Sequence, residues 1–138
     1  MLRECARVLR PGGLLAAVAI ECPPGLSAAD AELAAVLGPA DVHADGALVE
    51  MAATVGLEPL HVVDWTHGLR AVAERTITAL EGSAEAIRLT EGDAVYEEEL
   101  SKKARMVEGI DRGVLVRTLV IARRGRGALP GARRGLAS

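Results

Sequence analysis

The chain has 138 residues, of which 50% are hydrophobic and 25% are charged, a composition that fits one globular domain and excludes disorder over the whole length. It contains 25 Ala, one Trp, one Tyr and no Phe, so we expect an aliphatic core built largely from small side chains. The net charge is -3, but residues 1–122 hold 11 basic and 19 acidic side chains while residues 123–138 hold five Arg and no acid; an acidic body argues against a nucleic-acid partner.

Cysteine content and apolar runs indicate the compartment. Cys5 and Cys22 are the two cysteines, too few for a disulfide framework or a structural zinc site with its paired ligands, so we expect a reducing, cytoplasmic environment. Arginines precede the apolar run of residues 14–20, as in a secretory signal, but Pro11-Gly12-Gly13 interrupts the junction and no small-residue cleavage pattern follows. No apolar run approaches the roughly 20 residues of a membrane span, so no membrane partner is expected.

The first half of the chain alternates helix and strand patterns. Apolar residues at helical spacing occupy residues 1–10, and the continuous apolar run of residues 14–20 predicts a strand covered on both faces, as in a mostly parallel sheet. Ser27, with Asp30 three residues later, predicts the start of a helix that Gly38-Pro39 ends. The first helix begins where the chain begins, without a capping residue before it, which suggests a fragment of a larger domain.

The clearest helix pattern lies near the middle of the chain. Asp45 is placed to cap it, and its apolar face is predicted to hold Leu48, Met51, Ala52 and Val55. Gly56 supplies a left-handed end and Leu57 the apolar contact after it. A second strand is predicted over residues 59–65.

The second half is mainly helical. One helix is predicted from the face of Leu69, Ala73, Ile77 and Leu80, and another from that of Tyr96, Leu100, Ala104 and Val107. Residues 97–99 are all Glu and lie beside Lys102, Lys103 and Arg105, which predicts a solvated helix face with ion pairs. Gly113 precedes the last predicted strand, residues 114–122, and residues 125–138 are expected to form a flexible basic tail.

This order of elements predicts an α/β fold. Three strands are few for a doubly wound sheet with both faces covered. The sequence therefore indicates an incomplete sheet.

Residues 7–15, RVLRPGGLL, resemble the helix-turn-strand segment of S-adenosylmethionine-dependent methyltransferases with a Rossmann-like fold. Val55-Gly56-Leu57 is similar to that family's element before its sixth strand, and the ending Ala122-Arg123-Arg124 is similar to that of its seventh strand. The resemblance spans residues 1–124 and implies a partial Rossmann-like sheet, namely the family's last three strands with the final one antiparallel between the other two. It also implies a helical lid insertion at about residues 69–108, similar to small-molecule methyltransferases of the sarcosine, tocopherol or sterol type.

The family's cofactor, S-adenosyl-L-methionine, is held by a glycine-rich turn after the first strand, an acid after the second and a polar residue after the third or fourth. None of these has a counterpart here, and Gly12-Gly13 follows a helix instead of a strand. We therefore expect no cofactor-binding residue in this chain, no cofactor binding by the chain alone, and no activity without the family's N-terminal half.

Candidate site residues follow the first two strands, because ligands of open α/β sheets bind beyond the carboxyl ends of parallel strands. On the substrate side the candidates are Glu21, Cys22, Trp65 and Thr66. Glu21 is alternatively a solvated strand-end carboxylate, and Trp65 is alternatively a packing residue. His67 is the weak candidate for a catalytic base, with a surface role as the alternative. His43 and His61 have no partners at ligand spacing, so no metal site is expected.

Three functions remain open from the sequence. The first is the substrate-side half of a methyltransferase acting on a small-molecule methyl acceptor. The second is a nonenzymatic remnant or interaction module, since the edge of residues 14–20 would lack its neighbouring strand and invite self-association or an N-terminal partner half. The third is a complete, unrelated α/β binding module, which a closed or fully covered sheet would support.

Overall fold

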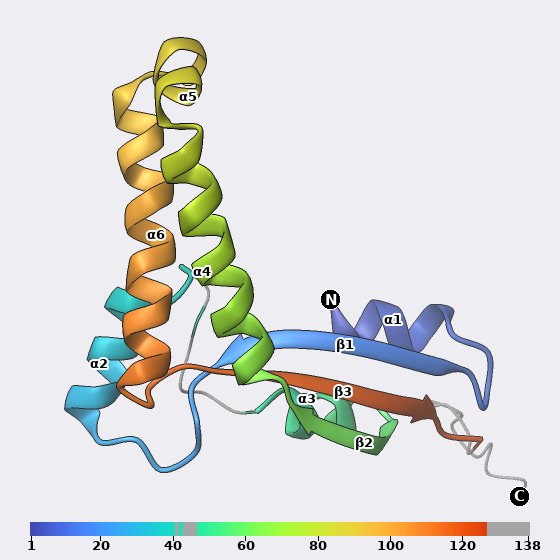
Figure 1. Cartoon of the computed structure of the whole chain (residues 1–138). Coiled ribbons are helices and arrows are strands. Elements are labelled where there is room, and N and C mark those ends of the chain that lie inside the picture. Colours follow the sequence, from blue (N-terminus) through green and yellow to red (C-terminus); the bar gives the residue numbers. More distant parts are fainter. Residues whose placement is uncertain (41, 43–46, 127–138) are drawn as a thin grey trace, which may run out of the picture.

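The computed structural model describes residues 1–40, 42 and 47–126, and it confirms the α/β class (Figure 1). In chain order the elements are α1 Leu2–Val8, β1 Leu14–Glu21, α2 Ala28–Leu37, α3 Leu48–Thr54, β2 Leu57–Asp64, α4 Thr66–Gly82, α5 Ala84–Glu91, α6 Asp93–Asp111 and β3 Val116–Arg124. No helix in these residues is both long and apolar enough to cross a membrane. The Asp45 cap and His43 fall outside the described residues, as does most of the predicted tail.

The three strands form one sheet in the order β1-β3-β2, and β3 runs antiparallel to both neighbours. This is the arrangement that the resemblance implied. The apolar run of residues 14–20 had instead suggested a mostly parallel sheet, but every strand pair in the described sheet is antiparallel. Glu21 pairs with Val116, and Asp64 pairs with Thr118. The carboxyl ends of β1 and β2 therefore meet at the beginning of β3.

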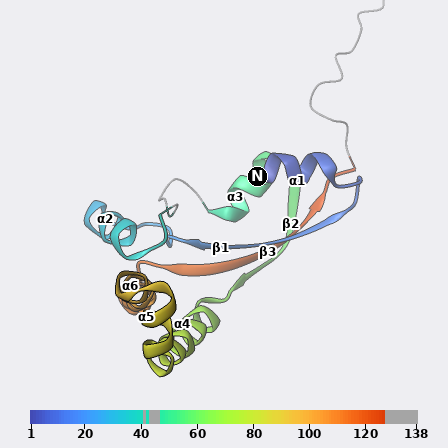
Figure 2. The same ribbon diagram turned by 90° about the horizontal axis from the view of Figure 1, so that it is seen from above.

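Helices α1 and α3 cover one face of the sheet, and α4, α5 and α6 project from the other side near the end of β2 (Figures 1 and 2). The core beneath α1 and α3 is aliphatic: its fully buried members are Ala6, Leu48, Ala52, Leu57, Val120 and Ala122. Small side chains let the helices approach the strands closely, as the alanine content predicted.

The prediction that β1 is covered on both faces is wrong. Leu15, Ala17 and Ala19 pack against the core, but Leu14 is 61% and Val18 43% exposed on the opposite side. We call this opposite side, which includes Leu14 and Val18, the open face. Because the sheet is neither closed nor fully covered, the structure does not favour the third function considered above.

Hydrogen bonds join the turn between α1 and β1 to the end of β3. Gly12 has a φ of 80°, which glycine adopts without a Cβ clash, and its N–H donates to the Arg124 carbonyl at 2.9 Å. The Arg124 N–H in turn donates to the Gly13 carbonyl at 2.8 Å. The Arg124 guanidinium donates to the carbonyls of Arg7 and Leu9, where α1 ends. Two sequence motifs far apart in the chain thus form one structural joint.

Several element boundaries differ from the predictions because packing decides them. Helix α3 begins at Leu48 with Ala47 as its N-cap, and Met51, expected on its apolar face, is 45% exposed. Strand β2 spans Leu57–Asp64, so Trp65 caps α4 and does not end the strand. Ser27 does cap α2 through its side chain, as predicted.

A second apolar cluster joins the helices to the start of β3. Ala34, Leu37, Val42, Val114 and Leu115 are buried together. Val114 and Leu115, predicted to begin the last strand, instead precede β3 and bond through their N–H groups to the Gly109 carbonyl. The helical segment between β2 and β3 contains a separate short helix, α5, which the sequence patterns did not predict.

Candidate functional site

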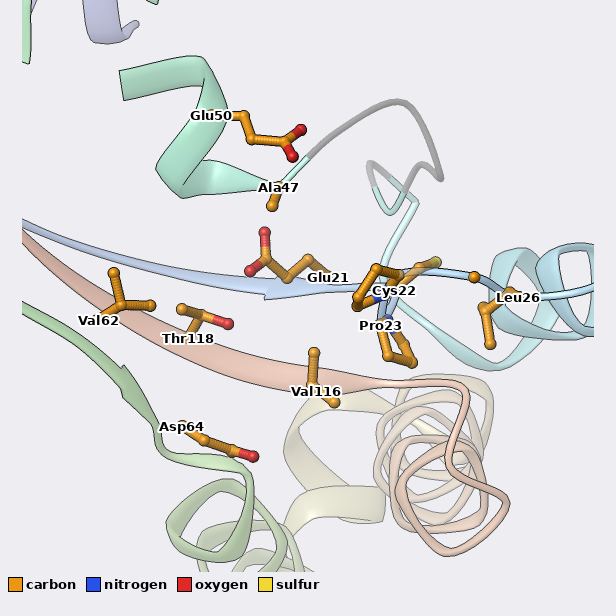
Figure 3. A pocket seen from close by; sticks show the side chains of 12 residues that line it. Glu21, Cys22, Pro23, Leu26, Ala47, Glu50, Val62, Asp64, Val116 and Thr118 are labelled. Atoms are coloured by element: carbon orange, nitrogen blue, oxygen red, sulfur yellow. The ribbon is translucent and has the colours of Figure 1, made fainter. Parts of the chain in front are cut away.

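A cleft of about 550 Å³ lies at the carboxyl ends of β1 and β2, bounded by the loop after β1 and the start of α3. Figure 3 shows Glu21 at the end of β1 pointing toward Ala47, Thr118 on the neighbouring β3, and Asp64 at the end of β2 on the other side of β3. Cys22 and Glu50 also line the cleft. The volume falls within the roughly 300–1,000 Å³ range of small-molecule pockets.

Glu21 has a defined structural contact that neither sequence-based interpretation included. Its Oε2 accepts a hydrogen bond of 2.8 Å from the backbone N–H of Leu48, the first residue of α3. This bond satisfies one of the N–H groups that a helix start leaves unpaired. Glu21 therefore fixes the position of α3 at the rim of the cleft, while the rest of its carboxylate lines the cleft.

Cys22 and Asp64 have altered acidities. Burial raises the pKa of the Cys22 thiol, and the negative charge of Glu21 raises it further, so this thiol is a poor nucleophile at neutral pH. Hydrogen bonding from the Thr66 side chain, followed by that from its backbone N–H, lowers the pKa of Asp64. The Thr66 N–H lies 2.8 Å from Asp64 Oδ1. This lowered pKa keeps Asp64 ionised at neutral pH.

Trp65, Thr66 and His67 directly follow β2, but they are not among the described residues that line this cleft. Trp65 is 49% exposed, and its ring lies 5.1 Å from the Arg117 guanidinium. Thr66 Oγ1 accepts a hydrogen bond of 3.0 Å from the Arg117 N–H and so joins α4 to β3. His67 is exposed on the first turn of α4.

The Gly12-Gly13 turn does not fit the cofactor's requirement for free backbone donors. Both N–H groups are already bonded, that of Gly12 to the Arg124 carbonyl and that of Gly13 to the Arg10 carbonyl. The turn also lies at the opposite end of β1 from the cleft (Figure 1). Across residues 1–40, 42 and 47–126, no cluster of three or more His, Cys, Asp or Glu side chains could hold a metal ion.

No protein-family profile matches the chain, and no curated protein matches it in sequence. Solved structures do match it. A candidate sarcosine dimethylglycine methyltransferase from Galdieria sulphuraria superposes with a TM-score of 0.76 at 20% identity, over 92% of this chain and 47% of that one. The fold of the chain described here is therefore methyltransferase-like.

Two further structures share this methyltransferase-like fold. Phosphoethanolamine N-methyltransferase 2 from Haemonchus contortus, bound to phosphomonomethylethanolamine and S-adenosylhomocysteine, has a TM-score of 0.72 at 16% identity, over 90% of this chain and 29% of that one. The cyclopropane synthase MmaA2 from Mycobacterium tuberculosis has a TM-score of 0.67 at 15% identity, over 89% of this chain and 48% of that one. The chain thus spans less than half the length of these structures.

Proposed function

We propose that this chain forms the substrate-side half of an S-adenosylmethionine-dependent methyltransferase that acts on a small molecule. The methyltransferase-like fold supports the proposal. The observation that carries it is the cleft between Glu21 and Asp64, because open α/β sheets bind ligands beyond the carboxyl ends of their strands. The carboxylates that line the cleft would orient a polar acceptor, and positioning of the acceptor is the main catalytic contribution that such a half can make.

The residues after β2 have distinct proposed roles. Trp65, which is exposed outside the described cleft lining, is proposed as an aromatic wall for a part of the substrate that extends beyond the cleft. Thr66 holds the start of α4 against β3 through its bond to Arg117. His67 is the candidate base for an acceptor that must lose a proton. Helices α4, α5 and α6 form the lid of the site in this proposal, and residues 125–138 form its basic tail.

The cofactor is proposed to bind to a partner half and not to this chain. The edge of β1 that faces away from β3 has no strand partner among the described residues, so an N-terminal half could extend the sheet there by backbone pairing. The exposed Leu14 side chain would be buried in the same contact. These surfaces fit a cytoplasmic enzyme that is either assembled from two separate halves or formed by one longer polypeptide that contains both.

Isothermal titration of the folded chain with S-adenosylmethionine and S-adenosylhomocysteine tests this division. We expect no binding, because the described glycine turn has no free donors. Saturable one-site binding would overturn the assignment of the cofactor site to another half. The coding DNA upstream of Met1 gives a second test: an in-frame glycine-rich strand-turn-helix supports one longer polypeptide, whereas a nearby stop codon excludes it and favours the nonenzymatic alternative.

A nonenzymatic interaction module is the second candidate function, favoured by the unpaired edge of β1 and the exposure of Leu14. In this case the chain would self-associate through the exposed edge of β1. Light scattering after size exclusion would then show a dimer that Leu14→Lys dissociates, whereas Leu89→Lys, at an 86% exposed site on α5, would leave it intact. A monomer at all concentrations would contradict this candidate.

A further inference from the structure

A second cavity, of about 530 Å³, separates the sheet from the helical segment. Apolar side chains line it from three elements: Val18 and Ile20 on β1, Leu69 and Val72 on α4, and Met106 on α6. Lys103 and Arg117 are the charged residues of the described lining, and no Asp or Glu belongs to it. The cavity therefore combines an apolar body with positive charge, in an otherwise acidic protein.

Lys103 differs from its neighbour Lys102 although the sequence places both in one charged run. Lys102 is exposed and forms ion pairs with Glu98 at 3.2 Å and Glu99 at 2.9 Å. Lys103 is half-buried, lines the cavity, and forms no ion pair with the residues that the structure describes. Lys103 thus lines the cavity, whereas Lys102 lies on the solvated face of α6 that the sequence predicted for both.

Arg117 is held in place from its backbone. Its N–H donates to Thr66 Oγ1 at 3.0 Å, its carbonyl accepts from the Trp65 N–H at 2.7 Å, and its guanidinium stacks over the Trp65 ring. Its Nε is buried without a hydrogen-bond partner, and no described carboxylate pairs with the guanidinium. A buried hydrogen-bond donor without an acceptor is unfavourable. An anion bound beside Arg117 would supply the missing acceptor.

We propose that this cavity binds a small amphipathic anion, with its acidic group between Lys103 and Arg117 and its aliphatic body against Val18, Leu69 and Met106. The charge of the lining selects an anion over a cation or a neutral molecule. The cavity volume lies in the roughly 300–1,000 Å³ range of small-ligand pockets, which are mostly apolar with a few convergent polar groups. An arginine also forms two parallel hydrogen bonds to a carboxylate, which a lysine cannot.

Decanoate is a suitable probe, because it places one carboxylate on an unbranched aliphatic chain. Trp65 is the only Trp of the protein and stacks on Arg117, so its fluorescence reports the site directly, and isothermal titration gives the affinity. We expect saturable one-site binding of decanoate, and binding at least about tenfold weaker for decanol and decyltrimethylammonium, since a tenfold change corresponds to loss of one charge-assisted contact.

Variants locate the site. Lys103→Met and Arg117→Met are expected to weaken decanoate binding at least about tenfold, whereas Lys102→Met, which removes the same charge one residue away, is expected to leave it unchanged. Lys103→Met decides the outcome if Arg117→Met does not fold, because Lys103 makes no described ion pair or hydrogen bond; circular dichroism checks the fold of each variant.

Three results would overturn the proposal: no binding of decanoate, equal binding of decanol, or equal effects of Lys102→Met and Lys103→Met. The decanoate titration contains no methyl donor, so a negative result would not contradict the proposed methyl transfer. Conversely, a chain without a role in methyl transfer could still bind decanoate at this cavity.

Discussion

Carboxylates at the ends of β1 and β2 each accept a hydrogen bond from the backbone of a helix that begins nearby. Glu21 accepts from the N–H of Leu48, and Asp64 accepts from the N–H of Thr66, both at 2.8 Å. Helix N-termini favour negative charge because their N–H groups lack partners and the helix dipole is positive there. Each carboxylate therefore couples a strand end to the start of a helix, β1 to α3 and β2 to α4, and both carboxylates lie at the candidate site.

Replacing Glu21 tests the contact with α3. Glu21→Ala should lower the free energy of unfolding by about 1–2 kcal/mol, the range measured for loss of a helix N-cap, because the Leu48 N–H loses its part-buried acceptor. Urea unfolding measures the change. Glu50→Ala is the matched control, since Glu50 lines the same cleft and lies in the first turn of α3 but accepts no hydrogen bond in the described structure; equal losses for both variants would refute the capping role.

Replacing Asp64 tests the pH dependence of stability. Hydrogen bonding by Thr66 lowers the pKa of Asp64 in the folded state, so its stabilising contribution is present above its unfolded pKa of about 3.9 and disappears as the pH falls through the lower folded value. Asp64→Asn keeps an acceptor oxygen but does not titrate. We expect wild type to be more stable than Asp64→Asn at pH 7 and the difference to vanish in acid, as measured by chemical unfolding across pH. A difference that does not change with pH would exclude this linkage.

At the scale of elements, close contact between α6 and the start of β3 requires a glycine. A Cβ at Gly109 would lie 2.4 Å from Leu115 Cδ1 and 2.8 Å from its Cγ, in the buried cluster of Leu37 and Leu115. Gly82 also lies in a helix, α4, but a Cβ there would meet nothing within 4 Å. The two helical glycines therefore differ in the space around them.

This difference gives opposite predictions for the two positions. Gly109→Ala should destabilise the protein by about 1–3 kcal/mol, the usual effect of overpacking. Gly82→Ala should stabilise it by up to about 1 kcal/mol, because alanine restricts the unfolded backbone and favours helix. Thermal and urea unfolding of the two variants measure both effects. Stabilisation by Gly109→Ala would show that Leu115 moves aside at little cost.

At the scale of the whole molecule, β3 is the central strand of the sheet and the last of the described elements. It pairs with β1 and β2 along its length and contributes Val120 and Ala122 to the core. Helix α5, in contrast, has no buried residue. Because β1 and β2 meet only through β3, the described sheet does not assemble until β3 is in place.

Hydrogen exchange should reflect this organisation. Amides of β3 around Val120 are expected to exchange slowest, near the rate set by global unfolding, and those of α5 fastest among the described helices, since local opening exposes little apolar surface there. Exchange followed by mass spectrometry or NMR measures the order. Protection of α5 equal to that of β3 would instead indicate that α4, α5 and α6 unfold together with the sheet.

The methyltransferase-like fold by itself does not decide the chemistry of the whole molecule. The [4+2]-cyclase SpnF also superposes on this chain, with a TM-score of 0.62 at 20% identity. Function resides in the site and not in the fold. Titrations with S-adenosylmethionine and with decanoate therefore test the function of this protein more directly than a further structural match would.

Local sequence determined the elements whose causes are local. Ser27 caps α2, Gly56 adopts a positive φ and Leu57 is buried after it, because capping and turn geometry depend on a few adjacent residues. The resemblance of residues 7–15 also led to the correct position of β3 between β1 and β2. Topology also predicted that the carboxyl ends of the first two strands lie on the same side, with Glu21 as a candidate, but Asp64 was not predicted because the second strand was expected to continue to residue 65.

Only the tertiary structure decided which side chains meet across long separations. Glu21 caps a helix 27 positions away, Arg124 closes α1 from the other end of the described chain, and Lys103 faces a cavity while Lys102 faces solvent. Helical periodicity cannot separate two adjacent lysines unless the packing of α6 against the sheet is known. Spacing describes one element at a time, whereas these contacts depend on how several elements pack together, and so does the exposure of one face of β1.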